Sequence, residues 1–209
     1  MKKSLYLFGL LFTASIIFTA CGEDKPPPCL ITDVGVVIDG TRWATRNADI
    51  NRTFAPHPQS PGASFQWNRC QGWSATIPCV GIGIPIEGWN NTPAEGTAWY
   101  AENDPCPAGW RVPTEAELHS LNNAGSTWTM RNGVNGRVFG TAPHQVFLPA
   151  AGFRISTVGT LVNVGVSGGY LSSTQIRSTG VIGLHFHTDS SSMFDWYRVS
   201  GLSVRCVAK

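Results

Sequence analysis

The sequence predicts a domain of short strands and many turns with a single short helix. Three observations predict this: Gly, Pro, Asn, Ser and Thr are abundant, apolar residues alternate over short runs, and one stretch carries a helix start signal. The chain has 209 residues. That length is enough for one domain with a real core once a leader is removed.

The N-terminus reads as an export signal. Lys2 and Lys3 precede an almost wholly apolar run, so we expect residues 1–20 to be a signal peptide. The run ends in Phe-Thr-Ala before Cys21, which resembles a bacterial lipobox. Lipidation of Cys21 would anchor the chain to a membrane without a spanning helix. The alternative is ordinary signal cleavage, with Cys21 in a disulfide.

Residues 21–33 are expected to form a tether. Glu23 and Asp24 resemble the surface-export signal of Bacteroidetes lipoproteins, and Pro26–Pro28 favours a stiff, extended chain. We expect the folded domain to occupy residues 34–209. The predicted location is the outer membrane, lipid-anchored, with the domain at the cell surface.

The charge balance argues against nucleic acid as a partner. Without Lys2 and Lys3 the 15 basic residues become 13, which equals the 13 acidic residues, so the net charge is zero. No basic run occurs. Nearly all remaining basic residues are arginine, which proteins often retain for planar, bidentate pairing in crowded places.

The predicted elements follow in chain order. Asp39-Gly40 predicts a hairpin turn within 34–42, and 65–67 is a short strand candidate. Residues 68–103 form a long irregular segment rich in tryptophan, and long ordered loops are often functional. Later strand candidates are 136–139, 146–148, 161–166, 181–187, 193–197 and 202–207.

The single helix begins after Thr114. Thr114 can cap it, with Glu117 as the capping-box partner three residues later. Leu118 and Leu121 give an apolar stripe, and Asn122–Gly125 ends the helix. A helix of about ten residues is unstable alone, so tertiary packing must hold it.

Five cysteines follow Cys21. They allow two disulfides and leave one thiol, and the sequence alone does not fix the pattern. Cys70 and Cys79 bracket a short loop and form the most natural pair. Cys106 and Cys206 would then join the loop before the helix to the last strand. Cys29 is left over, either free or joined to another chain.

The sequence offers no clear catalytic constellation. Gly-x-Ser-x-Gly and His-Glu-x-x-His are both absent, and Glu115 and Glu117 are better explained as helix-cap and dipole partners. His185, His187 and Asp189 could share a strand face and bind a metal, or form a plain polar face. We predict no catalytic site, no metal and no cofactor.

Exposed tryptophan beside Asn and Gly is typical of a binding surface. Trp73, Trp89, Asn90 and Asn91 are therefore the candidates for ligand contact. Their rings could stack on a sugar or anchor a protein interface. The alternative is that they pack the long loop onto the domain.

Six blocks occur in order along the chain: GTRWATRN (40–47), FQWNR (65–69), DPCPAGWRVPTEAEL (104–118), AGFR (151–154), GGYLSST (168–174) and GLSVRCV (201–207). Together they closely resemble one family, the Fibrobacter succinogenes major paralogous domain of exported Bacteroidetes lipoproteins. The resemblance covers about 35–208.

The resemblance implies an α+β, C-type-lectin-like fold, with a twisted antiparallel sheet, few short helices and long loops. It implies that Gly109, Trp110, Arg111 and Pro113 are framework positions. It also supports the bridge from Cys106 to Cys206.

Relatives by fold include formylglycine-generating enzymes, which need two nearby late cysteines, and calcium-dependent lectins, whose Glu-Pro-Asn or Gln-Pro-Asp triplets are absent here. The expected function is therefore non-catalytic: a binding or accessory subunit of an envelope or adhesive assembly, with protein partners. A glycan-binding module is the alternative. A metal-dependent or formylglycine-generating-like enzyme is the least favoured reading.

Overall fold

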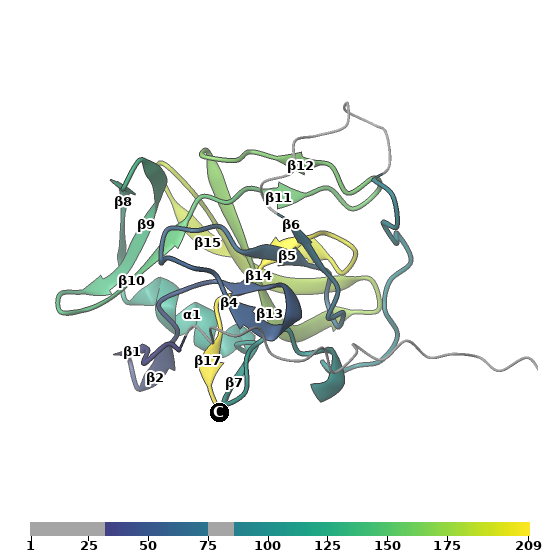
Figure 1. The fold of residues 1–209 in the computed structure, drawn as a ribbon, viewed down its shortest axis with the longest axis horizontal. Coiled ribbons are helices and arrows are strands. Elements are labelled where there is room, and N and C mark those ends of the chain that lie inside the picture. Colours follow the sequence, from purple (N-terminus) through teal and green to yellow (C-terminus); the bar gives the residue numbers. More distant parts are fainter. Residues whose placement is uncertain (1–31, 75–85) are drawn as a thin grey trace, which may run out of the picture.

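The structure is a computed structural model that describes residues 32–74 and 86–209. Over these residues the chain is mostly β-sheet, with one α-helix and long loops (Figure 1). This confirms the coarse prediction of a small α+β or mostly-β fold. The expected leader, Cys21, Cys29 and Cys79 lie outside the described residues. None of the helices in the described ranges has the length and apolar character needed to cross a membrane.

A six-stranded sheet forms the centre of the domain. Its neighbouring strands are antiparallel, except that β13 and β16 are parallel. In spatial order the strands are β15 (Ser191–Tyr197), β14 (Gly180–His187), β13 (Ser167–Arg177), β16 (Leu202–Ser203), β5 (Ala63–Phe65) and β6 (Gly72–Ser74).

One face of this sheet packs on the helix and on a second sheet. Helix α1 spans Glu115–Asn123, and the second sheet has the order β10-β9-β8. Leu118 and Leu121 of the helix, with Leu184 and Phe186 of β14, belong to one buried core. The strands of the second sheet are β8 (Ser126–Arg131), β9 (Val134–Thr141) and β10 (His144–Pro149).

The other face packs against loops. Trp67, Leu171, Val181 and Leu202 are buried there in a second core. This core also contains Cys106 and Cys206. Four short strands flank this core: β3 (Ala48–Asp49), β4 (Thr53–Phe54), β11 (Phe153–Arg154) and β12 (Leu161–Val162). The short helices are η1 (Ile50–Arg52) and η2 (Ala101–Asn103).

A four-stranded sheet brings the start of the domain beside its end. Its order is β1-β2-β17-β7, with β1 (Val36–Ile38), β2 (Thr41–Trp43), β7 (Trp110–Arg111) and β17 (Val207–Ala208). The predicted hairpin at Asp39-Gly40 is confirmed: both residues have positive φ, 46° and 78°, as a tight turn between two strands requires.

The helix begins as the sequence predicts. Thr114 and Glu117 form a capping box, and Arg111 donates both terminal nitrogens to the Glu117 carboxylate at 2.8 and 2.6 Å. Burial alone raises the pKa of Glu117, but the hydrogen bonds from Arg111 and Thr114 outweigh it, so the pKa is lowered overall. Arg111 is therefore a structural partner of the helix start.

The predicted strand at 202–207 is wrong in its extent. The chain leaves the six-stranded sheet after Ser203 and enters the four-stranded sheet at Val207. Between them, the carbonyls of Val204 and Cys206 accept hydrogen bonds from Ala48 and Ala44 at 2.9 Å. These two carbonyls of the crossover are therefore hydrogen-bonded although the strand is not continuous.

Other strand boundaries differ for local reasons. The predicted strand at 161–166 stops at Val162, because Asn163 turns the chain with φ 59°. Strands β8 and β13 were not predicted from the sequence. Gly168 in β13 argues against a strand by propensity, yet a Cβ there would lie 2.3 Å from the Phe186 ring, so only glycine fits.

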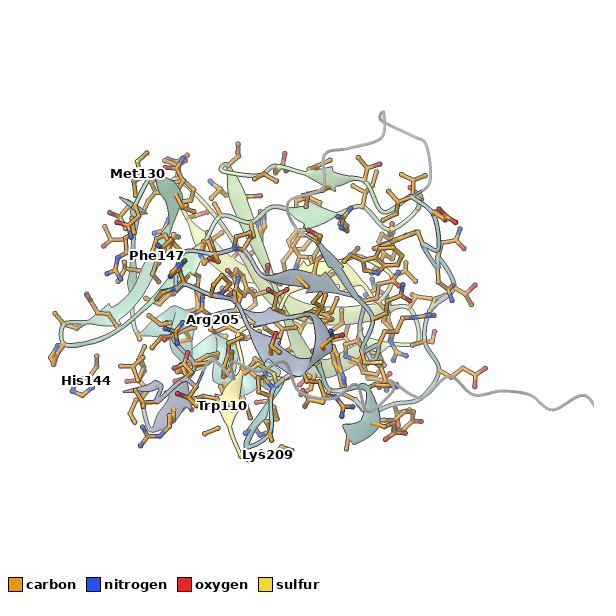
Figure 2. The ribbon with its side chains drawn as sticks, viewed as in Figure 1. Trp110, Met130, His144, Phe147, Arg205 and Lys209 are labelled. Carbon is orange, nitrogen blue, oxygen red and sulfur yellow. A yellow bond between two sulfur atoms is a disulfide. The ribbon has the colours of Figure 1, made fainter. Side chains whose placement is uncertain are left out.

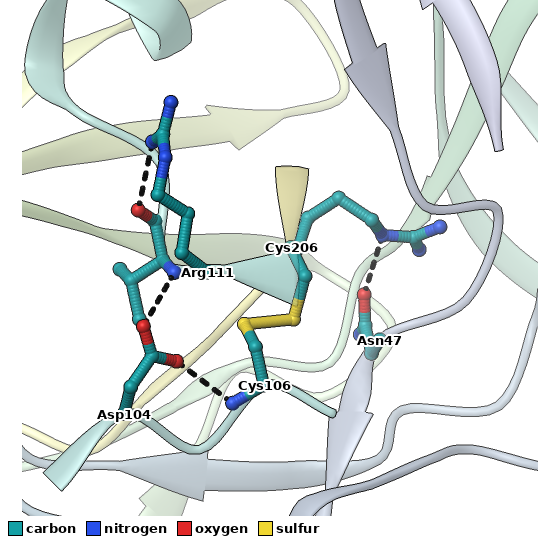
Figure 3. Close-up of a disulfide and its surroundings, with 7 residues drawn as sticks. Asn47, Asp104, Cys106, Arg111 and Cys206 are labelled. Atoms are coloured by element: carbon teal, nitrogen blue, oxygen red, sulfur yellow. Dashed lines mark hydrogen bonds between the residues drawn. A yellow bond between two sulfur atoms is a disulfide. The ribbon is translucent and has the colours of Figure 1, made fainter. Parts of the chain in front are cut away.

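A disulfide joins Cys106 to Cys206, as predicted (Figure 3). Both residues are buried, 5% and 0% exposed, and their Cα atoms are 6.0 Å apart. Asp104 fixes the loop before the bridge by accepting the amides of Cys106 and Val112 at 2.9 and 3.2 Å. Burial raises the pKa of Asp104 despite these bonds.

Cys70 is also disulfide-bonded, and its expected partner, Cys79, lies outside the described residues.

Next to the bridge, Arg205 (labelled in Figure 2) is wholly buried without a carboxylate partner among the described residues. It donates Nε to Asn47 Oδ1 at 3.0 Å, and its terminal nitrogens to the carbonyls of Ala44 and Phe147 at 3.2 and 3.0 Å. Burial lowers its pKa because the charged form is poorly solvated there. Arg205 thus ties three distant segments together through neutral acceptors.

Replacing both Cys106 and Cys206 with alanine should strongly lower the free energy of unfolding. The bridge spans a sequence separation of 100, and the loop-entropy model then gives a loss of roughly 4–5 kcal/mol. Denaturant titration of the oxidised wild type and the double variant measures it. A loss below about 1 kcal/mol, or peptide mapping that shows the two cysteines unlinked, contradicts this account.

Candidate functional site

The long loop at residues 86–104 is the candidate functional surface. It runs along one end of the domain, opposite the β8–β10 sheet (Figure 1). Apart from η2 it has no helix or strand. The predicted irregular segment, 68–103, is wrong at Gly72–Ser74, which pairs with β5 as strand β6. Its exposed side chains include Glu87, Asn91, Thr97 and Tyr100. The loop has only a few internal backbone hydrogen bonds, so most of its carbonyls need donors from outside the loop.

Side chains from the scaffold supply those bonds by donating to loop carbonyls. Gln66 donates to Asn90 O at 2.6 Å, and Arg69 donates to Thr92 O at 2.8 Å. Two further donors act on the next stretch: Asn68 to Glu95 O, and Arg198 to Ala94 O and Gly96 O. The segment 90–96 is therefore fixed from below by side chains that lie outside the loop.

Asn68 also holds the later part of the loop. Its Oδ1 accepts the amide of Tyr100 at 2.8 Å and the side-chain amide of Asn103 at 3.2 Å. The residue is buried and has φ 53°, a conformation that asparagine tolerates better than most residues. One side chain thus connects the middle of the loop to its end.

Trp67 packs against both the loop and Arg198. It is fully buried, and its indole nitrogen donates to Ser173 O at 3.2 Å. The Arg198 guanidinium lies over its ring, 4.0 Å from the centroid, and Trp99 of the loop packs edge-on against it at 5.8 Å. The FQWNR block is therefore the support of the loop, a role that the sequence analysis did not assign.

Two of the four predicted contact residues come together. The rings of Trp73 and Trp89 lie with centroids 5.3 Å apart, and both side chains are half-buried. The Trp89 indole nitrogen donates to Ser156 O at 2.9 Å. Its ring also packs so closely on Gly159 that a Cβ there would lie 2.5 Å away. Trp89 therefore packs the loop onto the domain.

The two asparagines lie beside this pair and are exposed. Asn90 Oδ1 accepts the amide of Thr92 at 2.8 Å, so its side chain holds a local turn. Asn91 has no hydrogen bond within the described part of the chain, so it is free to meet a partner. Of the four candidates, Asn91 is the one whose side chain has no structural role.

Two surface hollows border the segment 93–97. One, of about 400 Å³, is lined by Asn68, Arg69 and Tyr100 among others. The second, of about 450 Å³, lies between this segment and the turn after β13, with Arg198 in its lining. Neither hollow was predicted from the sequence. The excess of arginine over lysine was the one signal, since it indicated that arginines would occupy buried positions.

The histidine pair on β14 lies on a half-buried aromatic face. The rings of His185 and His187 are 6.1 Å apart, and Phe194 and Trp196 lie 5.6 and 5.5 Å from His185. Burial, with a smaller effect of His187, lowers the pKa of His185. Within residues 32–74 and 86–209, no three His, Cys, Asp or Glu side chains are grouped closely enough to hold a metal.

Compared with protein-family models, with curated proteins and with solved structures, the chain gave no match.

Trp89→Ala should lower the free energy of unfolding by about 2–3 kcal/mol, because it removes a buried ring surface and leaves Ser156 O without its donor. The matched control, Asn91→Ala, should change it by less than about 0.5 kcal/mol. Thermal or denaturant unfolding measures both. Equal values for the two variants would contradict the packing role of Trp89.

Proposed function

We propose that this protein is a lipid-anchored, non-catalytic binding or accessory subunit of an envelope or adhesive assembly. The anchor is the lipidated Cys21, which places the domain at the outer membrane and, with the acidic residues that follow, at the cell surface. The lipobox-like sequence and the proline-rich tether support this part of the proposal. The tether holds the domain away from the lipid.

The finer fold in this proposal is C-type-lectin-like, within the Fibrobacter succinogenes major paralogous domain. The six ordered sequence blocks support it. So do the coarse features of the structure: a largely antiparallel central sheet, one helix, a long loop, and a disulfide between the two halves of the chain.

One observation carries the binding role: the loop backbone is fixed while its outer side chains are exposed. Five hydrogen bonds from Gln66, Asn68, Arg69 and Arg198 hold the carbonyls of 90–96. Asn91, Thr97 and Tyr100 remain exposed on the outside. A pre-organised loop loses little conformational entropy on binding, which favours affinity.

A glycan is the second candidate ligand. The observation that favours it is the half-buried Trp73–Trp89 pair beside exposed Asn91, since aromatic rings next to amides suit a sugar's apolar face and its hydroxyls. Because Trp89 is also a packing residue, Trp73 and Asn91 would make most of such a contact.

Site-specific photo-crosslinking in native cells tests the function. A photo-reactive residue placed at Asn91 should give a discrete crosslinked product. The same residue at Met130, which is 62% exposed on β8 at the opposite end of the domain (Figure 2), is the matched control and should give none. A product that contains protein supports the subunit role, and one that contains carbohydrate supports the glycan role. Equal crosslinking at both positions, or none at Asn91, contradicts a binding role for the loop.

A further inference from the structure

The hollow that Arg198 lines has a mainly apolar surface, with polar side chains on both sides of it. Its volume is about 450 Å³, and the lining includes Thr97 from the loop and Gln175, Ser178 and Thr179 from the end of β13 and the turn after it. Thr97, Ser178 and Thr179 are exposed. These side chains offer hydroxyls and an amide to anything that enters.

Arg198 is 2% exposed, and its guanidinium is only partly satisfied. Nη1 donates to Ala94 O and Gly96 O at 3.0 Å, and both of these residues line the hollow. The ring of Trp67 covers one face. Within the described residues, Nε and Nη2 have no hydrogen-bond partner and no carboxylate pairs with Arg198.

This is an unusual state for a buried cation. Buried charges in proteins are normally paired, and buried donors are normally hydrogen-bonded. Arg205, which is also buried, uses Nε and both terminal nitrogens. Burial also lowers the pKa of Arg198, since nothing nearby compensates the charge. An anion with two acceptor oxygens would satisfy Nε and Nη2 together.

We propose that this hollow binds the carboxylate of a small polyhydroxylated acid, such as a uronic acid unit of a glycan. A carboxylate matches the planar fork of a guanidinium, and Thr97, Gln175, Ser178 and Thr179 suit the hydroxyls of the same molecule. Glu95 lies in the lining with an exposed carboxylate, which disfavours a dianion such as phosphate more than a monoanion.

The inference rests on the proposed binding function. It names a ligand class for the hollow between the loop segment 93–97 and the turn after β13. The hollow does not include Trp73, Trp89, Asn90 or Asn91. Crosslinking at Asn91 and ligand binding in the hollow can therefore fail separately, which keeps the two proposals distinguishable.

Isothermal titration of the detergent-extracted full-length protein with sodium glucuronate tests the site, with glucose as the neutral control. Glucuronate should bind and glucose should not. Ser178→Glu adds a carboxylate to the rim at an exposed residue whose side chain makes no hydrogen bond, and it should weaken glucuronate binding by about tenfold. The matched variant Ser178→Gln, of similar size and no charge, should bind like the wild type.

Several results would overturn the proposal. They are no binding up to about 10 mM glucuronate, binding of glucose equal to that of glucuronate, inorganic phosphate that binds as well as glucuronate, or equal effects of the Glu and Gln substitutions. A crystal structure with glucuronate present that shows only water at Arg198 would do the same. Polygalacturonate that binds more tightly than free glucuronate identifies a glycan as the source of the carboxylate, and binding of the free acid alone identifies a small molecule.

Discussion

The need to satisfy the backbone of a long irregular loop is the constraint on which the rest of this structure depends. Residues 86–100 contain no helix or strand, so most of their carbonyls have no backbone amide of the loop as a donor. Long polar side chains of residues 66–69 and of Arg198 donate hydrogen bonds to the loop carbonyls instead. The loop can then be both irregular and ordered, and its outer side chains are left for contact with a partner.

Arginine serves the same purpose elsewhere in the domain. Arg137 donates to the carbonyls of Ser126, His187 and Thr188, and Arg205 joins Ala44 to Phe147. Each guanidinium has several donors in a fixed plane, so one side chain can satisfy carbonyls from separate segments. Among the arginines of the described residues, Arg111 and Arg177 are the two that pair with carboxylates. The disulfide adds a covalent link between the segment before the helix and the crossover that holds Arg205.

Local sequence signals predicted the local features well. The capping box at Thr114 and the turn at Asp39-Gly40 each depend on a few nearby residues, and both are confirmed. The bridge from Cys106 to Cys206, which the family resemblance supported, is confirmed as well. Strand β13 was missed because Gly168 is explained only by the Phe186 ring on the neighbouring strand. The support of the loop was missed for the same reason. Gln66 and Asn68 meet their carbonyl partners 24 and 27 residues further on, and Arg198 meets its own 104 and 102 residues back.

Amide hydrogen exchange at Tyr100 tests the central claim most directly, because this amide donates to the Asn68 side chain and not to the backbone. The account predicts exchange about 100-fold slower than in an unstructured peptide, and much slower than for Thr97 and Ala98, whose amides have no partner in the described part of the chain. Asn68→Gly, which keeps the left-handed backbone but removes the side chain, should abolish that protection while β14 stays protected. A Tyr100 amide that exchanges freely in the wild type, or stays protected in Asn68→Gly, would contradict the account.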